Sequence, residues 1–101
     1  MDRTHQLIII GGGPAGLSAG LYASRSKLDT LLIEKAGLGG QILNAEMVEN
    51  YPGFPQGISG SELGALIAQQ ATKYGLLTAF AEVQGSEIRG AEEVVSTSEG
   101  Q

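Results

Sequence analysis

The feature that most constrains this chain is a glycine-rich turn between a strand and a helix, in the segment QLIIIGGGPAG at residues 6–16. The apolar residues 7–10 have the composition of a strand, and glycines 11, 13 and 16 follow with the spacing G-x-G-x-x-G. In a βαβ unit this spacing is typical of a turn that binds the pyrophosphate of a dinucleotide. We therefore expect a strand, a tight turn and a helix N-terminus here.

Each glycine of the turn has a separate physical role. Gly11 permits the sharp reversal of the backbone, Gly13 leaves room for a pyrophosphate beside the main chain, and Gly16 lets the helix pack closely on the sheet. Free N–H groups at the helix start, together with the helix dipole, favour an anion at the same point. Pro14 suits the first helical position, where no N–H is required.

A second apolar run, residues 31–33, ends at Glu34. Glu34 follows Gly13 by about the 20 residues expected for an acid that binds a ribose 2′-hydroxyl. The glycine spacing alone is weak evidence, because a glycine-rich turn can be only a turn. The preceding strand, the following helix and the acid at this distance together favour nucleotide binding.

Composition narrows the classes of partner. The 101 residues allow one domain at most, and the formal net charge is −5 without any basic run. This charge argues against nucleic acid or an anionic membrane surface as a partner. The sequence has no cysteine, which excludes disulfides, thiolate metal sites and a redox dithiol within it.

Neither a metal site nor an export signal is expected. The single histidine, His5, has no nearby partner for a metal pair. The apolar run before the glycines has only four residues, which is too short for a signal peptide or a membrane span. A cytoplasmic protein is therefore the expectation.

The first third of the sequence predicts a βαβ unit and hence an α/β fold with a central parallel sheet. Residues 6–10 are expected to form a buried parallel strand because the apolar run is continuous. A helix is expected at 14–26, and a strand at 30–34 returns parallel to the first through a right-handed crossover. Gly20 lowers helix propensity by about 1 kcal/mol relative to alanine, so we expect it to be required for close packing.

The stretch from 35 to 60 is rich in glycine and proline. A short helical turn is expected between Gln41 and Asn50. Two interpretations stay open for the whole stretch: a flexible surface excursion, or an ordered loop with a function.

The remainder predicts one helix and several strands. Ser59 and Glu62 have the spacing of a capping box, and the helix that follows is expected to end at Lys73–Gly75. Its apolar face is expected to contain Leu63, Leu66, Ile67 and Tyr74. Strands are expected at 77–83, 87–89 and 94–97, the last two joined by a turn near Gly90.

Four motifs carry a resemblance to a known family: LIIIGGGPAGLSAGLYASR at 7–25, GGQI at 39–42, VENYPGFP at 48–55 and GISGSELG at 57–64. The sequence resembles the N-terminal part of the low-molecular-weight, bacterial-type thioredoxin reductases, which are class II pyridine nucleotide-disulphide oxidoreductases. Many flavin and nicotinamide enzymes share the first motif, whereas GGQ followed by VENYPG is much narrower. The resemblance covers essentially the whole chain and implies a Rossmann-like FAD/NAD(P)-binding fold with the start of a β-meander.

The resemblance also implies a role for each motif. The turn from Gly11 to Ala15 would contact the FAD pyrophosphate, and Glu34 would bind the adenosine ribose. The segment from Glu34 to Gln41 would wrap the nucleotide, with its end near the ribityl chain and the flavin. Asn50 would reach the isoalloxazine, and the main chain of Val83 would meet the adenine. The implied cofactor-binding residues are Gly11, Gly12, Gly13, Pro14, Ala15, Gly16, Glu34, Lys35, Gly39, Gly40, Gln41, Asn50 and Val83.

In this family the FAD domain is discontinuous, and an inserted NADPH domain carries a Cys-x-x-Cys pair. The resemblance therefore implies that residues 1–101 are the N-terminal portion of the FAD-binding domain, with no catalytic residue and without the NADPH domain or the later FAD segment. The complete enzyme would transfer hydride from NADPH to FAD and electrons to a dithiol and then to thioredoxin, usually as a homodimer. The chain alone is expected to bind FAD or its ADP moiety without turnover.

Three alternatives stay open. One is an enzyme of similar fold without a dithiol, such as the thioredoxin-reductase-like ferredoxin or flavodoxin NADP reductases. Another is that the βαβ unit binds NAD rather than FAD, against which GGQ and VENYPG argue. The third is a non-catalytic fragment that keeps the βαβ fold and holds no cofactor, since a sheet lacking later strands leaves an open edge.

Overall fold

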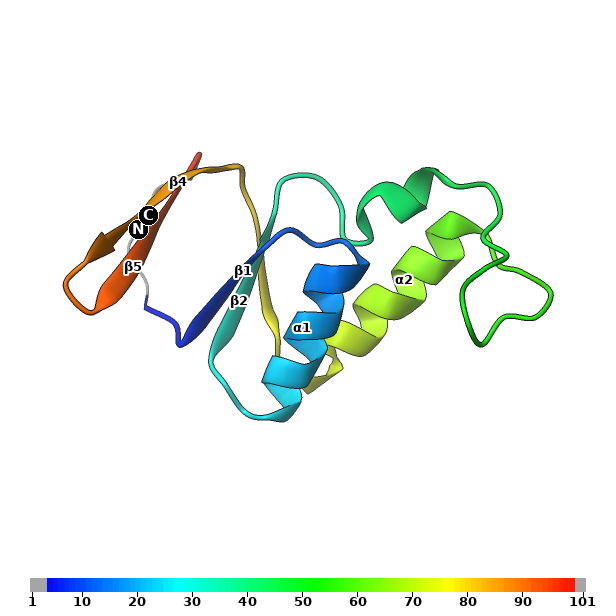
Figure 1. Ribbon diagram of the computed structural model, residues 1–101, viewed down its shortest axis with the longest axis horizontal. Helices are drawn as coiled ribbons and strands as arrows, with labels where there is room; N and C mark the ends of the chain where they lie inside the picture. Colours follow the sequence, from blue (N-terminus) through cyan, green and yellow to red (C-terminus); the bar gives the residue numbers. More distant parts are fainter. Residues whose placement is uncertain (1–3, 100–101) are drawn as a thin grey trace.

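A computed structural model describes residues 4–99, and its centre is a parallel sheet with two helices on one face (Figure 1). The strands are β1 (Leu7–Ile10), β2 (Thr30–Glu34) and β3 (Leu77–Phe80), in the order β1-β2-β3. The helices are α1 (Pro14–Arg25) and α2 (Gly60–Ala71), which lie side by side. The α/β class and the parallel sheet expected from the sequence are confirmed.

The core lies between the sheet and the two helices. Leu17 of α1 and Leu32 of β2 are fully buried, and Ala71 of α2 and Leu76 complete the cluster. Ile9 packs against this cluster from β1, in register with Leu32. Because β2 is central and its apolar run meets both helices, the βαβ unit forms around it.

Close packing explains the glycine inside α1. A Cβ on Gly20 would lie 2.6 Å from Cδ2 of Leu76, which is shorter than any ordinary contact. The expectation that Gly20 is required for close packing is therefore confirmed. Leu76 directly precedes β3, so this contact holds α1 against the segment that leads into the third strand of the sheet.

The capping box at the start of α2 is present. Ser59 is the N-cap, and its hydroxyl oxygen accepts a hydrogen bond from the Glu62 N–H at 3.2 Å. A short 3-10 helix, η2 (Thr72–Tyr74), follows α2, and Gly75 ends it with φ of 92°. The expected apolar face is partly wrong: Leu63 is buried and Ile67 packs against the core, whereas Leu66 and Tyr74 are half exposed. Tyr74 lies beyond the end of α2, in η2.

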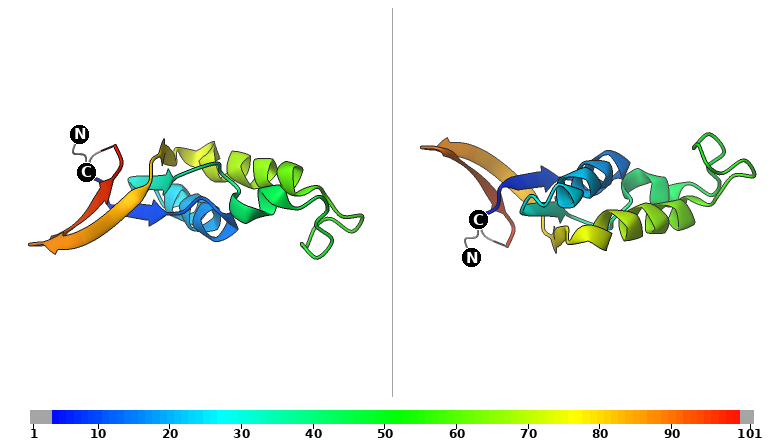
Figure 2. Two further views of the ribbon diagram at one scale, coloured as in Figure 1. Left: turned by 90° about the horizontal axis from the view of Figure 1, so that it is seen from above. Right: turned by 90° about the horizontal axis from the view of Figure 1, so that it is seen from below.

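The strand expected at 77–83 is two strands in two sheets. β3 ends at Phe80, and Val83 begins β4 (Val83–Arg89), which pairs antiparallel with β5 (Glu92–Thr97). The chain leaves the parallel sheet where the Ala81 N–H donates to the Glu34 carbonyl at 3.0 Å. The β4–β5 hairpin then extends from one end of the molecule, while residues 45–58 form a loop at the other end (Figure 2).

The first strand is less buried than its sequence predicts. Leu7 is 36% exposed and Ile10 is 56% exposed. Within the described part of the chain, β1 has a neighbouring strand only on the β2 side, so one edge of it is open. No helix among residues 4–99 is long and apolar enough to cross a membrane.

Candidate dinucleotide site

The glycine turn connects the carboxyl end of β1 to the start of α1. Gly11 has φ of 106°, a left-handed conformation that favours glycine, and its N–H donates to the Ile33 carbonyl at 2.8 Å. Gly13 is the N-cap of α1 and Pro14 occupies the first turn, as expected. The turn therefore lies where a doubly wound sheet places its ligand, outside the carboxyl ends of the strands.

The other two glycines of the motif differ in what surrounds them. A Cβ on Gly16 would lie 2.0 Å from the Gly11 carbonyl oxygen, so α1 approaches the turn as closely as a glycine permits. Apart from its two chain neighbours, a Cβ on Gly13 would meet no atom of residues 4–99 within 4 Å. Packing thus accounts for Gly16, and open space is left beside Gly13.

Glu34 ends β2 beside this turn, and its carboxylate accepts two backbone hydrogen bonds. The Gly12 N–H donates to Oε1 at 2.8 Å, and the Ala36 N–H donates to Oε2 at 2.7 Å. These two bonds hold the pKa of Glu34 below its ordinary value of 4.5, and the bond from Ala36 has the larger effect. At neutral pH the side chain is therefore a carboxylate, and each oxygen keeps a lone pair for a further donor.

The segment after β2 folds back onto the glycine turn. The Gly39 N–H donates to the Gly12 carbonyl at 2.7 Å, and Gly39 has φ of 117°. A Cβ on Gly40 would lie 2.9 Å from Cα of Gly13. The structure thus brings Gly39 and Gly40 into contact with Gly12 and Gly13, two motifs that are far apart in the sequence.

A short 3-10 helix, η1 (Gly40–Asn44), carries this segment on to α2. A Cβ on Gly64 would lie 2.6 Å from Cδ2 of Leu43, and a Cβ on Gly60 would lie 1.9 Å from the Ile42 carbonyl oxygen. Gly60 and Gly64 are one helical turn apart and let η1 lie against α2. This contact is not among the sequence-based expectations, although the i, i+4 spacing of two glycines in a helix is a signal for it.

The loop that contains Asn50 is closed at its base by a backbone bridge. Val48 and Ile58 exchange two backbone hydrogen bonds, of 2.7 and 3.0 Å, and close the loop between them. Asn50 is exposed, and Figure 1 places this loop beyond the start of α2, away from the β4–β5 hairpin. The structure does not bring Asn50 into contact with the glycine turn. Asn50 therefore stays a prediction as a binding residue.

The remaining candidate residues lie around the turn without closing it. Lys35, Gln41 and Ala15 are exposed. Val83 lies three residues beyond Phe80, which pairs with Glu34, so the start of β4 is on the Glu34 side of the sheet. These positions remain predictions as binding residues.

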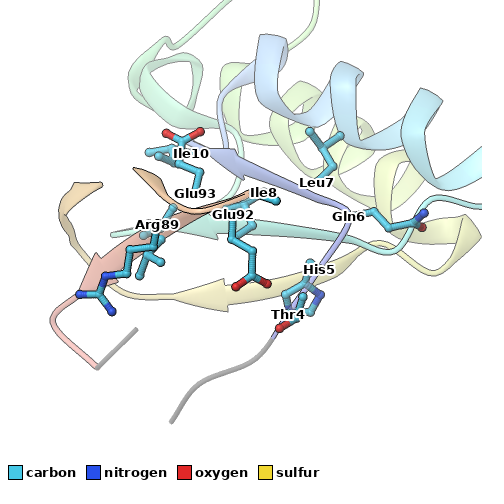
Figure 3. A pocket seen from close by; sticks show the side chains of 12 residues that line it. Thr4, His5, Gln6, Leu7, Ile8, Ile10, Arg89, Glu92 and Glu93 are labelled. Carbon is cyan, nitrogen blue, oxygen red and sulfur yellow. The ribbon is translucent and has the colours of Figure 1, made fainter. Parts of the chain in front are cut away.

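A hollow lies on the open side of β1, away from the glycine turn. This hollow, of about 530 Å³, lies between the N-terminal part of the chain, β1 and the β4–β5 hairpin (Figure 3). His5, Ile8, Arg89 and Glu92 are among its lining residues, and none of the candidate cofactor-binding residues is. The hollow marks the open side of β1, and it is separate from the glycine turn.

With this geometry, comparison with known proteins places the chain. Residues 5–101 match the family described as pyridine nucleotide-disulphide oxidoreductase. The chain belongs to this family. Its relatives include the bifunctional thioredoxin reductase/thioredoxin of Mycobacterium leprae, 42% identical over 100 residues, which are 99% of this chain and 22% of that protein. The thioredoxin reductase of Bacillus subtilis is 45% identical over 83 residues, 82% of this chain and 26% of that protein.

Solved structures of this oxidoreductase family agree with these relatives. The thioredoxin reductase of Lactococcus lactis superposes with a TM-score of 0.89 at 38% identity, over 94% of this chain and 31% of that chain. That of Streptococcus pyogenes gives a TM-score of 0.90 at 38% identity, over 95% and 31%. The resemblance found in the sequence motifs and the Rossmann-like fold are confirmed. The chain spans about a quarter of the length of the B. subtilis relative and about a third of the solved ones.

Proposed function

We propose that residues 1–101 are the N-terminal portion of the FAD-binding domain of an NADPH-dependent thioredoxin reductase. The observation that carries this proposal is the open space beside Gly13, at the N-terminus of α1 and next to the ionised Glu34. A ligand phosphate fits this position because helix N–H groups are free there and no side chain fills it. The names of the matched relatives support the choice of enzyme.

The residues of this chain would hold the successive parts of an FAD molecule. Gly11 to Ala15 would hold the pyrophosphate through backbone N–H groups, and Glu34 would accept a hydrogen bond from the adenosine ribose. Gly40 and Gln41 would adjoin the ribityl chain, and Asn50 would adjoin the flavin at the far end of the site. Val83 would offer its main chain to the adenine.

The protein part of the work assigned to this chain is binding and orientation. FAD supplies the redox chemistry when it is bound, namely hydride uptake from NADPH and electron delivery to a dithiol and then to thioredoxin. No cysteine occurs in this sequence, so the dithiol would belong to another part of the enzyme. A homodimer in the cytoplasm, with thioredoxin as electron acceptor, completes the proposal.

The decisive experiment compares two glycine-to-valine variants. We expect the purified chain to be yellow and to release FAD on denaturation, and Gly13→Val to lose the flavin absorbance. Gly13 has φ of −76°, which valine adopts, and the new side chain would occupy only the open space. Gly85→Val in β4 is the matched control, because a Cβ there also meets no protein atom within 4 Å.

The two variants separate binding from folding. Circular dichroism should show the same secondary structure in both, with flavin retained by Gly85→Val alone. Equal flavin content in Gly13→Val and the parent chain would contradict the site. A parent chain that takes up neither FAD nor ADP would contradict cofactor binding by residues 1–101.

A further inference from the structure

We propose that Glu34 is a positioning residue for the glycine turn: together with Gly39 and Gly40, it holds the peptide groups around Gly12 in the phosphate-binding arrangement before any nucleotide arrives. This inference rests on the proposed function, and it assigns to Glu34 a task other than contact with the ribose. It also assigns to Gly39 and Gly40 a role in shaping the pyrophosphate site.

Both sides of Gly12 are held by hydrogen bonds. The Glu34 carboxylate accepts from the Gly12 N–H at 2.8 Å, and the Gly12 carbonyl accepts from the Gly39 N–H at 2.7 Å. Gly12 itself is buried, and a Cβ there would lie 2.9 Å from Cδ2 of Leu38. Neither peptide group beside Gly12 can rotate without breaking one of these bonds.

The carbonyl bond has a consequence for the ligand side of the turn. A trans peptide is planar, with its C=O and N–H on opposite sides. When the Gly12 carbonyl points at Gly39, the N–H of Gly13 in the same peptide points away from Gly39. No residue among 4–99 accepts a hydrogen bond from that N–H. It is thus an oriented donor, free for a phosphate oxygen.

Charge gives a second reason to assign Glu34 this role. A carboxylate beside a pyrophosphate repels it, so the charge by itself weakens binding of a polyanion. A neutral acceptor would serve the ribose hydroxyl as well. Only a carboxylate offers two acceptor oxygens to the Gly12 and Ala36 N–H groups and still has lone pairs left for the ribose.

On the side of the glycine turn opposite Glu34, the turn is held by a segment that packs on α2. Gly40 lies so close to Gly13 that a Cβ on Gly40 would be 2.9 Å from Cα of Gly13. Leu43, three residues later, packs against Gly39 and Gly64, where an added Cβ would lie 2.8 and 2.6 Å from its Cδ2. The turn is therefore held between the end of β2 and a segment fixed on the second helix.

The test compares ADP with 2′-deoxy-ADP, which lacks the ribose hydroxyl that Glu34 would bind. Titration calorimetry of the parent chain and Glu34→Gln gives four affinities. The glutamine oxygen accepts only one of the two N–H groups well, and its NH₂ faces the other. We expect Glu34→Gln to weaken 2′-deoxy-ADP by about tenfold, although the substitution removes a repulsive charge. Unchanged or tighter binding of 2′-deoxy-ADP, with ADP weakened, would limit Glu34 to the ribose and overturn the proposal.

Amide exchange distinguishes failure of this inference from failure of the proposed function. If the parent chain binds neither nucleotide, the proposed function fails. Exchange of the Gly12 N–H in the ligand-free chain then still tests whether Glu34 holds the glycine turn. We expect this amide to be protected in the parent chain and to exchange about tenfold faster in Glu34→Gln. Equal exchange rates in the two proteins would overturn the proposed role of Glu34, whatever the nucleotide affinities are.

A second pair of variants tests the opposite side. Gly40→Ala should displace Gly13 and weaken ADP and 2′-deoxy-ADP by similar factors, because the change acts on the pyrophosphate position. Gly90→Ala in the β4–β5 turn is the matched control: φ is 62° there and 65° at Gly40, and a Cβ on Gly90 meets no atom within 4 Å. Equal affinities in these two variants would contradict the role of Gly40.

Discussion

At the scale of single residues, the candidate site depends on where a glycine is needed and where a charge is held. Gly16 and Gly40 are close to backbone atoms, whereas Gly13 faces open space. Glu34 connects the two halves of the site, because its carboxylate accepts from Gly12 of the turn and from Ala36 of the following segment. Its ionisation is therefore coupled to the local structure as well as to any ligand.

This coupling predicts a pH dependence of stability. The pKa of Glu34 is lowered in the folded chain, so the folded state binds fewer protons than the unfolded state near pH 4.5. The stabilisation is present above that pH and is lost as the pH falls through the lowered pKa. In urea unfolding, Glu34→Gln should be less stable than the parent chain at neutral pH, and the difference should shrink in acid. Glu46→Gln, at an exposed loop position, should follow the parent chain; parallel curves for Glu34→Gln and the parent would contradict the prediction.

At the scale of elements, the sequence predicts the bounds of those helices and strands that are set by neighbouring residues in the chain. The strand at 30–34 and the N-cap at Ser59 have the predicted bounds, because a continuous apolar run and a capping residue are read directly from the sequence. The break between β3 and β4 was missed, since neither Ala81 nor Glu82 is a turn-former. That break depends on the hydrogen bond from Ala81 to the Glu34 carbonyl and on the one from the Glu82 N–H to the Ser98 hydroxyl.

In the candidate site too, local patterns are predicted from the sequence and tertiary contacts are not. The glycine turn and Glu34 were predicted from one short βαβ pattern, and the structure places them together. The contact of Gly39 and Gly40 with the turn was not predicted from spacing, because it needs η1 to lie on the glycine pair of α2. Such a contact is set by tertiary packing and leaves only a weak trace in the sequence.

The packing of α1 gives a prediction at this scale. Gly20→Ala gains about 1 kcal/mol of helix propensity, but the overpacked contact with Leu76 costs about 1–3 kcal/mol, so we expect a net loss of stability of up to about 2 kcal/mol. Gly16→Ala should be more destabilising, because its new Cβ meets a backbone carbonyl that cannot yield. Urea denaturation measures both. The double variant Gly20→Ala/Leu76→Val should lose less than the sum of the two single changes; strict additivity would contradict the contact.

At the scale of the whole molecule, the described chain is elongated. Its principal extents are 50 × 27 × 17 Å, with a radius of gyration of 14.8 Å, against about 13 Å for a compact domain of 100 residues. The hairpin and the loop at residues 45–58 extend from opposite ends of a small core (Figure 2). In the sheet of this core, β1 has no second neighbouring strand among residues 4–99.

The open edge of β1 predicts self-association of the isolated chain. The N–H groups of Leu7 and Gly11 donate toward β2, so alternation directs the backbone groups of Ile8 and Ile10 toward the open edge. An exposed edge with half-exposed apolar side chains pairs readily with another chain. Sedimentation velocity should show the parent chain associating as its concentration rises, and Ile10→Lys should suppress this by placing a charge on the edge. Ile88→Lys, at an 80% exposed position in β4, is the control and should associate like the parent. A parent chain that stays monomeric throughout, or equal suppression by both lysines, would show that the edge of β1 is not the contact.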